Sequence, residues 1–287
     1  MDDTIRQLKP VEFPPLLAEI PQPPTELWAQ GILPSPDITL LCVVGSRKYT
    51  TYGKQVVDKL IGGLRGYPVG IVSGLALGVD ALAHEAALEN NLYTLAVPGS
   101  GLDESVLYPS TNKRLARRIL DSGGGLLSEL SPTTPAAKWT FTQRNRIMAG
   151  ICPATLLIEA GEKSGTLITA RMTVDYNREL LVVPGSIFSP TSLGTHQFLK
   201  LGATPVTEAS DILAVLGIEE HAPGEATPRP VLSPSEEQVL VYLHEPTDRD
   251  TLIRTLNLPV AEAGILLMQM EMHGYITCEA GVYYITI

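Results

Sequence analysis

The chain has 287 residues, of which 44% are hydrophobic and 18% charged, enough for one large domain with a substantial core and a second small one. The formal net charge of −10 excludes a protein that coats nucleic acid through overall positive charge, although a local basic groove is compatible with it. Three scattered cysteines in apolar surroundings indicate buried thiols in a reducing compartment, and no segment resembles a signal peptide or a membrane span. These features predict a cytoplasmic protein that has no membrane contact.

The first 38 residues contain eight prolines and short apolar patches. They predict an extended arm with about one helical turn that packs onto the main domain.

From residue 39 to 217, apolar runs that end in turns alternate with amphipathic stretches. Continuous apolar strands separated by helices are typical of a parallel sheet that is covered on both faces. The predicted fold class is therefore α/β, an extended Rossmann-like and mostly parallel sheet with helices on both faces. The expected strands are 40–46, 69–74, 92–99, 125–130, 154–160 and 179–185. The expected helices are 53–64, 79–89, 111–121, 144–150 and 165–177, with a late strand and helix in 202–216.

The remainder predicts a linker and a small second domain. Residues 218–232 are polar and rich in proline, as linkers are. Beyond them, Ser233 or Ser235 caps a helix that runs to Leu243, and helices follow at 248–256 and 260–273. Two β segments joined at Gly281 complete a winged-helix-like domain over 233–287.

Two strand ends predict an anion-binding turn. The first strand is followed by Gly45, Ser46, Arg47 and Lys48, where turn amides, a hydroxyl and fixed charge suit a phosphate. The alternative is a plain strand-to-helix turn with an exposed arginine. The second strand ends at Ser73 and Gly74, and the first two strand ends of such a sheet normally lie side by side.

The segment WTFTQRNRIMAG (139–150) predicts half of a single-stranded nucleic-acid site. It places Phe141 near Arg144, Asn145 and Arg146. Aromatic rings stack on nucleobases, and arginine both neutralises phosphate and stacks. The alternative is that Phe141 and a neighbouring isoleucine only pack a helix against a sheet.

Motifs for catalysis, cofactors or metals are weak. EAGEKSGT (159–166) lacks the glycine before lysine that a P-loop needs and is expected to start a helix. Ser46, Asp80 and His84 form a triad only on paper, because Asp80 and His84 are spaced like any helix face. Histidine and cysteine spacings indicate no metal site.

Five motifs together resemble the DNA-processing protein A family, DprA or Smf. They are GSR (45–47), SGLALGVDALAH (73–84), RNRIMAG (144–150), SGTLITA (164–170) and VVPGS (182–186). The resemblance runs from about residue 13 to 216 and keeps the family's order and spacing.

The resemblance implies a non-catalytic function without a cofactor. Members bind single-stranded DNA and load the recombinase RecA onto it during natural transformation, displacing or bypassing single-strand-binding protein. It also implies a homodimer joined through the Rossmann-like domain. Carried over, the DNA pocket comprises Arg47, Lys138, Phe141, Arg144 and Arg146, shaped by the turns at 45–46 and 73–74.

Two departures from the family pattern stand out. Many members carry a helical SAM-like domain at the N-terminus, and this sequence starts after the point at which that domain would end. The usual His-Phe pair before the RNR element is replaced by Trp139-Thr140-Phe141, where Trp139 either stacks on a base or wedges the loop.

The winged-helix-like domain is expected not to bind DNA. From Val231 onward there are two arginines and eight acidic residues, a net charge of −6, and the third helix has no lysine or arginine. Two other functions stay open. One is a nucleotide-binding enzyme related to the LOG-type phosphoribohydrolases, which EAGEKSGT disfavours because it lacks their paired glycines. The other is a nucleotide-sensing regulator.

Overall fold

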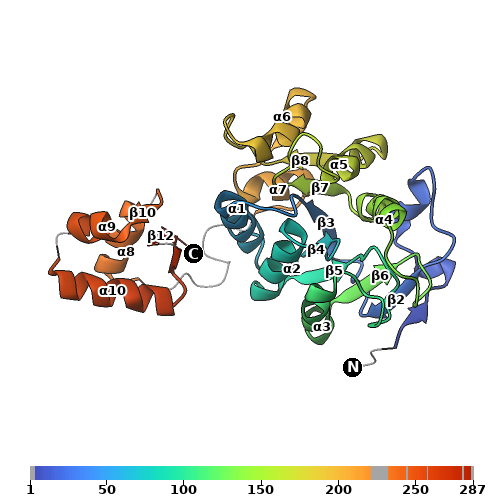
Figure 1. The fold of residues 1–287 in the computed structure, drawn as a ribbon, viewed down its shortest axis with the longest axis horizontal. Helices are drawn as coiled ribbons and strands as arrows, with labels where there is room; N and C mark the ends of the chain where they lie inside the picture. The colour runs from blue at the N-terminus through green and yellow to red at the C-terminus, as the bar shows by residue number, and fades with distance from the viewer. Residues whose placement is uncertain (1–3, 221–231, 244, 257, 280, 286–287) are drawn as a thin grey trace. The chain divides into compact units, whose positions relative to one another are not determined.

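The computed structural model describes residues 4–220, 232–243, 245–256, 258–279 and 281–285 (Figure 1). The chain divides into two compact units, residues 1–220 and 221–287, and each is described by itself. Most of the linker expected at 218–232 lies outside the described residues.

Unit 1 is built on a nine-stranded sheet with the order β1-β2-β6-β5-β4-β3-β7-β8-β9. The pairs from β6 across to β9 are parallel, whereas β1 and β2 are antiparallel to their neighbours. The expected mostly parallel sheet is confirmed. The strands are β1 (Arg6–Gln7), β2 (Trp28–Gly31), β3 (Thr39–Val44), β4 (Val69–Ser73), β5 (Tyr93–Ala96), β6 (Gly125–Ser128), β7 (Ala154–Leu157), β8 (Glu179–Val182) and β9 (Thr204–Pro205).

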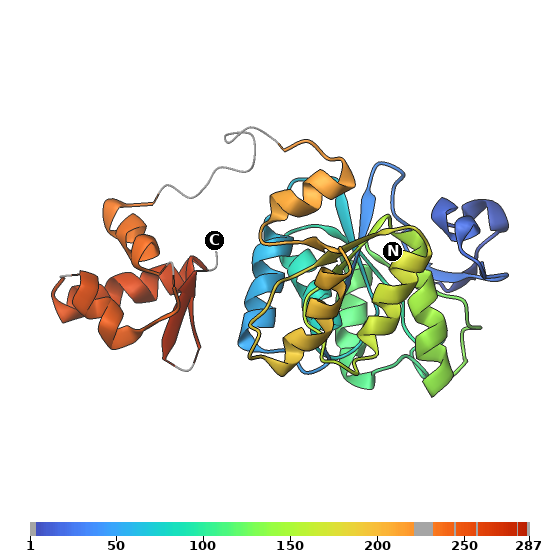
Figure 2. The ribbon, with the colours of Figure 1, turned by 90° about the horizontal axis from the view of Figure 1, so that it is seen from above.

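Helices cover both faces of this sheet, as the apolar strands require (Figures 1 and 2). The first face buries apolar side chains of α1 (Thr51–Gly62), α2 (Val79–Glu89), α3 (Lys113–Asp121) and α7 (Ala209–Leu216). The second face buries those of α4 (Lys138–Ile151), α5 (Thr166–Asp175) and α6 (Leu193–Lys200). Short 3-10 turns lie at η1 (Pro10–Glu12), η2 (Pro15–Glu19), η3 (Ser110–Asn112) and η4 (Pro190–Ser192).

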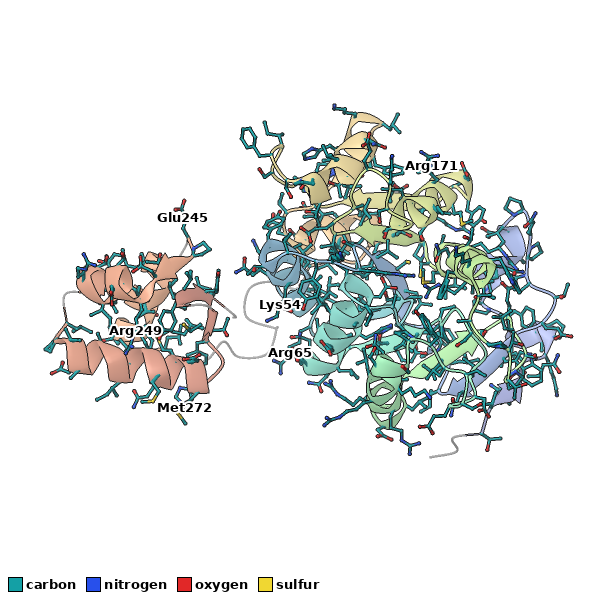
Figure 3. All side chains as sticks on the ribbon, viewed as in Figure 1. Lys54, Arg65, Arg171, Glu245, Arg249 and Met272 are labelled. Carbon is teal, nitrogen blue, oxygen red and sulfur yellow. The ribbon has the colours of Figure 1, made fainter. Side chains whose placement is uncertain are left out.

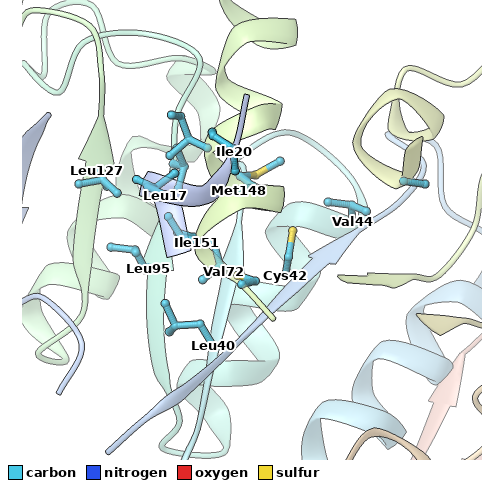
Figure 4. Packing of buried hydrophobic residues seen from close by; sticks show 14 of the residues in the cluster. Leu17, Ile20, Leu40, Cys42, Val44, Val72, Leu95, Leu127, Met148 and Ile151 are labelled. Carbon is cyan, nitrogen blue, oxygen red and sulfur yellow. The ribbon is translucent and has the colours of Figure 1, made fainter. Parts of the chain in front are cut away.

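The N-terminal arm is more ordered than its prolines predicted. Its strands β1 and β2 extend the sheet beyond β6, and its turn η2 packs on α4. Leu17 and Ile20 pack in one buried cluster with Met148 and Ile151 of α4 (Figure 4). The arm is therefore part of the core of unit 1 and not only an extended cover.

Two helices differ from expectation. Helix α4 begins at Lys138, six residues before the expected start, because the Ala137 amide donates to the Thr140 hydroxyl at 3.0 Å and so satisfies a free end group. Helix α6 follows the sixth apolar run, where only a strand end was expected.

The described residues of unit 2 form three helices, α8 (Pro234–Tyr242), α9 (Arg249–Leu256) and α10 (Val260–Met272), and a small sheet. Ser233 caps α8 and accepts from the Glu236 amide at 3.3 Å, as expected. The sheet has the order β10-β12-β11, with β10 (Thr247–Asp248), β11 (Ile276–Glu279) and β12 (Val282–Ile285). The short strand β10 was not expected.

Within the described residues, no single helix has the length and apolar content to cross a membrane. The pair α9 and α10 reaches both only when the two are counted together across a bend of 115°.

Candidate nucleic-acid interface

The main cleft of unit 1 lies where the strand order changes direction. From β3 the chain builds the sheet on one side through β4, β5 and β6, and after β6 it crosses to β7 on the other side of β3. Ligands of such sheets bind at the carboxyl ends of the strands at this point. A cleft of about 710 Å³ opens there. Its lining comes from the turn after β3 (45–48), the α4 face (141–148), the turn after β4 (76–80) and residues 161–169 after β7.

The turn after β3 is held by local hydrogen bonds. The Lys48 amide donates to the Ser46 hydroxyl at 3.0 Å, and that hydroxyl donates to the Lys48 carbonyl at 2.7 Å. From across the cleft, the Thr166 hydroxyl donates to the Gly45 carbonyl at 2.8 Å. Arg47 and Lys48 are exposed, so this turn presents two cations to solvent on a backbone that is held by hydrogen bonds.

One face of α4 forms the opposite wall. Phe141, Arg144, Asn145 and Met148 are spaced three, four and seven residues apart, so they lie on the same side of the helix, and all four line the cleft. The ring of Phe141 sits against Gly99, where an added Cβ would lie 2.5 Å from the ring. A side chain at position 99 would therefore displace the aromatic wall.

Arg144 is a buried cation at the base of this wall. It is 6% exposed, and its guanidinium donates to the Val97 carbonyl and, through Nε, to the Asn145 side chain at 3.2 Å. A Cβ at position 74 would overlap this guanidinium, so Gly74 gives it room. Burial raises the pKa of the neighbouring Asp80 carboxyl, while the charge of Arg144 and the Gly74 amide at 3.1 Å oppose that rise.

Arg47 and Phe141 meet at the mouth of the cleft. The Arg47 guanidinium carbon lies 5.4 Å from the centre of the Phe141 ring, a cation–π distance. The ring of Tyr108 lies 5.5 Å from Phe141 at 57° and is 46% exposed. The mouth thus carries two adjacent rings and a planar cation, the chemistry that stacks nucleobases and binds phosphate.

Besides Gly74, four candidate residues lie outside the cleft lining. Ser73 is fully buried and donates to the Val43 carbonyl at 2.7 Å. Arg146 points to the other side of α4, where it pairs with Glu129 and donates to the Gln22 carbonyl. Lys138 and Trp139 are exposed at the start of α4, Trp139 by 58%.

The sequence analysis expected Ser73 to shape the DNA pocket and Arg146 to lie in it, and neither side chain lines the cleft. Ser73 lies inside the sheet, and its hydroxyl is hydrogen-bonded to the neighbouring strand β3. Arg146 is two residues from Arg144, which is about 200° around a helix, so the two guanidinium groups leave α4 on opposite sides. Lys138 lies one turn before Phe141 on the same helix face, so its side chain can reach a nucleic-acid strand that passes over the Phe141 ring.

Residues 163–166 line the cleft although they were expected only to start a helix. They do both, because α5 begins at Thr166 and its first turn opens into the cleft beside Lys163 and Ser164. The order of β3 and β7 in the sheet brings these residues to the GSR turn.

Asp80 and His84 of the paper triad, and Glu159 of the EAGEKSGT segment, all make structural contacts. Asp80 binds the Gly74 amide, whereas His84 is fully buried and shares a 2.7 Å hydrogen bond with Thr94. The two carboxylate oxygens of Glu159 accept from the amide and hydroxyl of Thr50 at 3.0 and 2.6 Å and from Thr191 at 3.0 Å. In the described part of the chain, no group of three or more His, Cys, Asp or Glu side chains is arranged to hold a metal ion.

Comparison with known proteins identifies the family. Residues 5–217 match the family model of DNA recombination-mediator protein A, and residues 223–281 match that of the DprA winged helix domain. The chain belongs to the DprA family. The expected family and the expected combination of a Rossmann-like sheet with a winged-helix domain are thereby confirmed.

Relatives cover most of the chain. Protein Smf of Escherichia coli is 34% identical over 94% of this chain and 74% of its own length. DNA processing protein DprA of Streptococcus pneumoniae is 41% identical over 70% of both chains. The solved structure of the S. pneumoniae protein matches with a TM-score of 0.69 and 37% identity, covering 77% of this chain and 76% of that one.

A second solved structure concerns nucleic acid directly. It describes the single-stranded DNA binding mode of DNA processing protein A from Helicobacter pylori. It matches with a TM-score of 0.65 and 27% identity, and the match covers 74% of this chain and 95% of that one.

Proposed function

We propose that this DprA-family protein binds single-stranded DNA in the cleft of unit 1 and acts without catalysis as a loader of RecA. The observation that carries the proposal is the meeting of Arg47 and Phe141 at the mouth of a cleft that lies at the switch point of the sheet. A cation that binds phosphate and a ring that stacks on a base, side by side, recognise a polynucleotide whose bases are free.

The same geometry supports a preference for single strands. A duplex presents phosphates to Arg47 and Lys48 but keeps its bases stacked on one another, so Phe141 contributes nothing. A single strand offers both contacts, and each stacked base contributes roughly 1–3 kcal/mol whatever its identity.

Each cleft residue has a proposed role. Arg47 and Lys48 bind phosphate, together with the turn at Gly45 and Ser46. Phe141 stacks on a base, and Lys138 binds the backbone one helical turn away. Gly74, Asn145 and Arg144 shape and charge the floor of the cleft, whereas Ser73 and Arg146 hold the walls in place.

Several contacts support a non-catalytic role over a LOG-like hydrolase. Such an enzyme needs a glutamate free to act on its substrate, and Glu159 is bound to Thr50 and Thr191 through both carboxylate oxygens. His84 has no access to the cleft because it is fully buried. The proposal includes no cofactor.

The proposal includes the loading of RecA, the displacement of single-strand-binding protein and a homodimer through unit 1, and membership of a family of recombination mediators supports these partners. Unit 1 also exposes large apolar side chains outside the cleft that suit contacts with protein partners. Ile187, Phe188, Leu193 and Leu201 are among them.

The test is fluorescence anisotropy with labelled oligothymidine and a matching duplex. Wild-type protein should bind the single strand more tightly, with an affinity that falls as salt rises. Arg47→Ala should weaken binding strongly, and Phe141→Ala should reduce the free energy of single-strand binding by about 1–3 kcal/mol. Arg65→Ala is the matched control, because it removes one exposed cation beyond the far end of α1. Equal binding by wild type and Arg47→Ala at moderate salt would refute the cleft as the site.

Loading itself is measured with RecA on DNA coated by single-strand-binding protein. The wild-type protein should speed the assembly of RecA filaments, and Arg47→Ala should not. Tight DNA binding without any effect on RecA would contradict the loader role and leave the DNA-binding role intact.

A further inference from the structure

The first turns of α3 carry an unusual concentration of positive charge. Lys113, Arg114, Arg117 and Arg118 are four of the 21 lysines and arginines in a chain of net charge −10, and they lie within six residues that contain no acid. Arg114, Arg117 and Arg118 are exposed and Lys113 is partly buried. Their apolar neighbours Leu115, Ala116, Ile119 and Leu120 pack on the sheet, so the charges face solvent.

The carboxylates around this surface leave part of it free. Arg117 lies 3.2 Å from Asp121, and both are 61% exposed, so this pair is weak. Hydrogen bonds from Ser105 lower the pKa of the Asp103 carboxyl, and the charge of Lys113 lowers it further. Among the residues that the structure describes, no carboxylate forms an ion pair with Arg114 or Arg118.

This basic surface begins at the same edge of the sheet as the cleft. A helix that connects two parallel strands runs antiparallel to them, so α3, between β5 and β6, starts at their carboxyl ends. The Asn112 side chain, one residue before α3, donates to the carbonyls of Leu75 and Ala76 at 2.9 and 3.2 Å. Ala76 lines the cleft, so the start of α3 is bonded directly to the cleft wall.

Tyr108 bridges the cleft and α3. Its ring stands 5.5 Å from Phe141 and is half-exposed, and only η3 separates it from α3 along the chain. Arg47, Phe141 and Tyr108 follow one another in space, and Arg114 and Arg118 come six and ten residues after Tyr108 in the chain, on the helix that starts at this edge of the sheet. Alternating aromatic and basic side chains is the pattern that tracks a single strand.

We propose that a single-stranded DNA that enters the cleft leaves it across Tyr108 and continues along α3, which binds its phosphates through Arg114, Arg117 and Arg118. This rests on the proposed function, because it extends the same site. The positive end of the α3 dipole, at the sheet edge that the strand crosses, adds to the attraction.

The experiment compares two lengths of labelled oligothymidine, about 6 and about 20 nucleotides, against the full chain. The double variant Arg114→Glu/Arg118→Glu reverses two exposed charges on α3. The control Lys59→Glu/Arg65→Glu reverses two exposed charges away from the cleft, one in the last turn of α1 and one just after that helix. Thermal unfolding confirms that each variant is folded.

The proposal expects wild type to bind the long oligonucleotide more tightly than the short one. The α3 variant should bind the short one normally and lose the gain from length, and its log–log salt slope on the long one should be smaller by about 1.4, which is 0.7 per lost phosphate contact. The α1 variant should behave as wild type. Tyr108→Ala should also lose part of that gain, whereas Tyr108→Phe should keep it.

Two outcomes overturn the proposal. Wild-type behaviour of the α3 variant on both lengths would show that DNA does not reach α3. Equal loss on both lengths would show that α3 acts on the cleft and not on an extension of it. Failure of the wild type to bind either length would instead refute the proposed function itself.

Discussion

Arg146→Ala should destabilise the protein and not act on DNA directly, although Arg146 belongs to the RNR element. Its guanidinium pairs with Glu129 and donates to the Gln22 carbonyl, so it joins α4 to the segment after β6 and to the N-terminal arm. The two side chains are only 9% and 11% exposed. Burial already raises the pKa of the Glu129 carboxyl, and the charge of Arg146 opposes that rise.

The magnitude follows from leaving Glu129 buried without its partner. Removing one member of a buried ion pair costs about 3–5 kcal/mol. For a domain of this size each kcal/mol lowers the melting temperature by roughly 2–4 °C, so Arg146→Ala should lower it by about 6–20 °C. Arg47→Ala, at an exposed position, should leave the melting temperature within about 2 °C of wild type.

Thermal unfolding followed by circular dichroism measures the loss, and anisotropy at a temperature where both variants are folded measures binding. A double variant, Glu129→Ala/Arg146→Ala, should be more stable than Arg146→Ala alone because no uncompensated charge remains. An unchanged melting temperature for Arg146→Ala, combined with a large loss of single-strand affinity, would refute this reasoning and return Arg146 to the DNA site.

Three other predictions concern separate parts of the molecule. Burial lowers the pKa of His84 to about 3, so the unfolded chain binds a proton below about pH 6.5 that the folded chain does not. The stability that this group contributes is complete above that pH and falls by about 2 kcal/mol by pH 5. Denaturant unfolding above pH 6.5 and at pH 5 should show this loss in the wild type, whereas the free energy of unfolding of His84→Leu should depend less on pH. Gly99→Ala should weaken single-strand binding by displacing the Phe141 ring, and normal affinity in the anisotropy assay would count against Phe141 as a stacking platform. Arg249→Ala/Arg254→Ala, which removes both arginines of the winged-helix domain beyond Val231 (Arg249 in Figure 3), should change neither single-strand nor duplex affinity, and a clear loss would show that this acidic domain contacts DNA.

The central sheet was predictable because its strands are buried on both faces. Continuous apolar runs such as Leu40–Val44, short and separated by helical segments, are typical of strands in a parallel sheet. The edge strands β1 and β2 were not predictable in this way. β1 has two residues and β2 four; β1 pairs with β2, and β2 pairs with β6, which lies about 100 residues further along the chain.

The winged-helix domain shows the same division. Its three helices follow from caps and apolar spacing, and Leu267 and Met270 are buried as a core requires. Met268 is 55% exposed, and Met272 is 80% exposed on the same helix (Figure 3). A helix with apolar residues around most of its circumference does not reveal from sequence alone which side is covered.

The different positions of Arg144 and Arg146 could have been predicted from the sequence, but only with the correct start of α4. Once the helix begins at Lys138, its geometry puts Phe141, Arg144 and Asn145 on one face and Arg146 on another. Treating 139–143 as a loop removed that constraint, so both arginines were expected in one pocket. The Thr140 hydroxyl, three residues after Ala137, was the local signal for the earlier start.

The position of residues 163–166 at the cleft could not be predicted from the sequence, because it depends on the order of the strands in the sheet. A sequence shows that β3 and β7 are strands but not that they are neighbours, and about 110 residues separate them. Their pairing brings the Thr166 hydroxyl to the Gly45 carbonyl and makes the first turn of α5 a wall of the cleft. An acidic chain thereby gathers Arg47, Lys48, Arg144 and Lys163 around one opening. Because the field at a site depends on placement and not on totals, a net charge of −10 is compatible with a cleft that attracts phosphate.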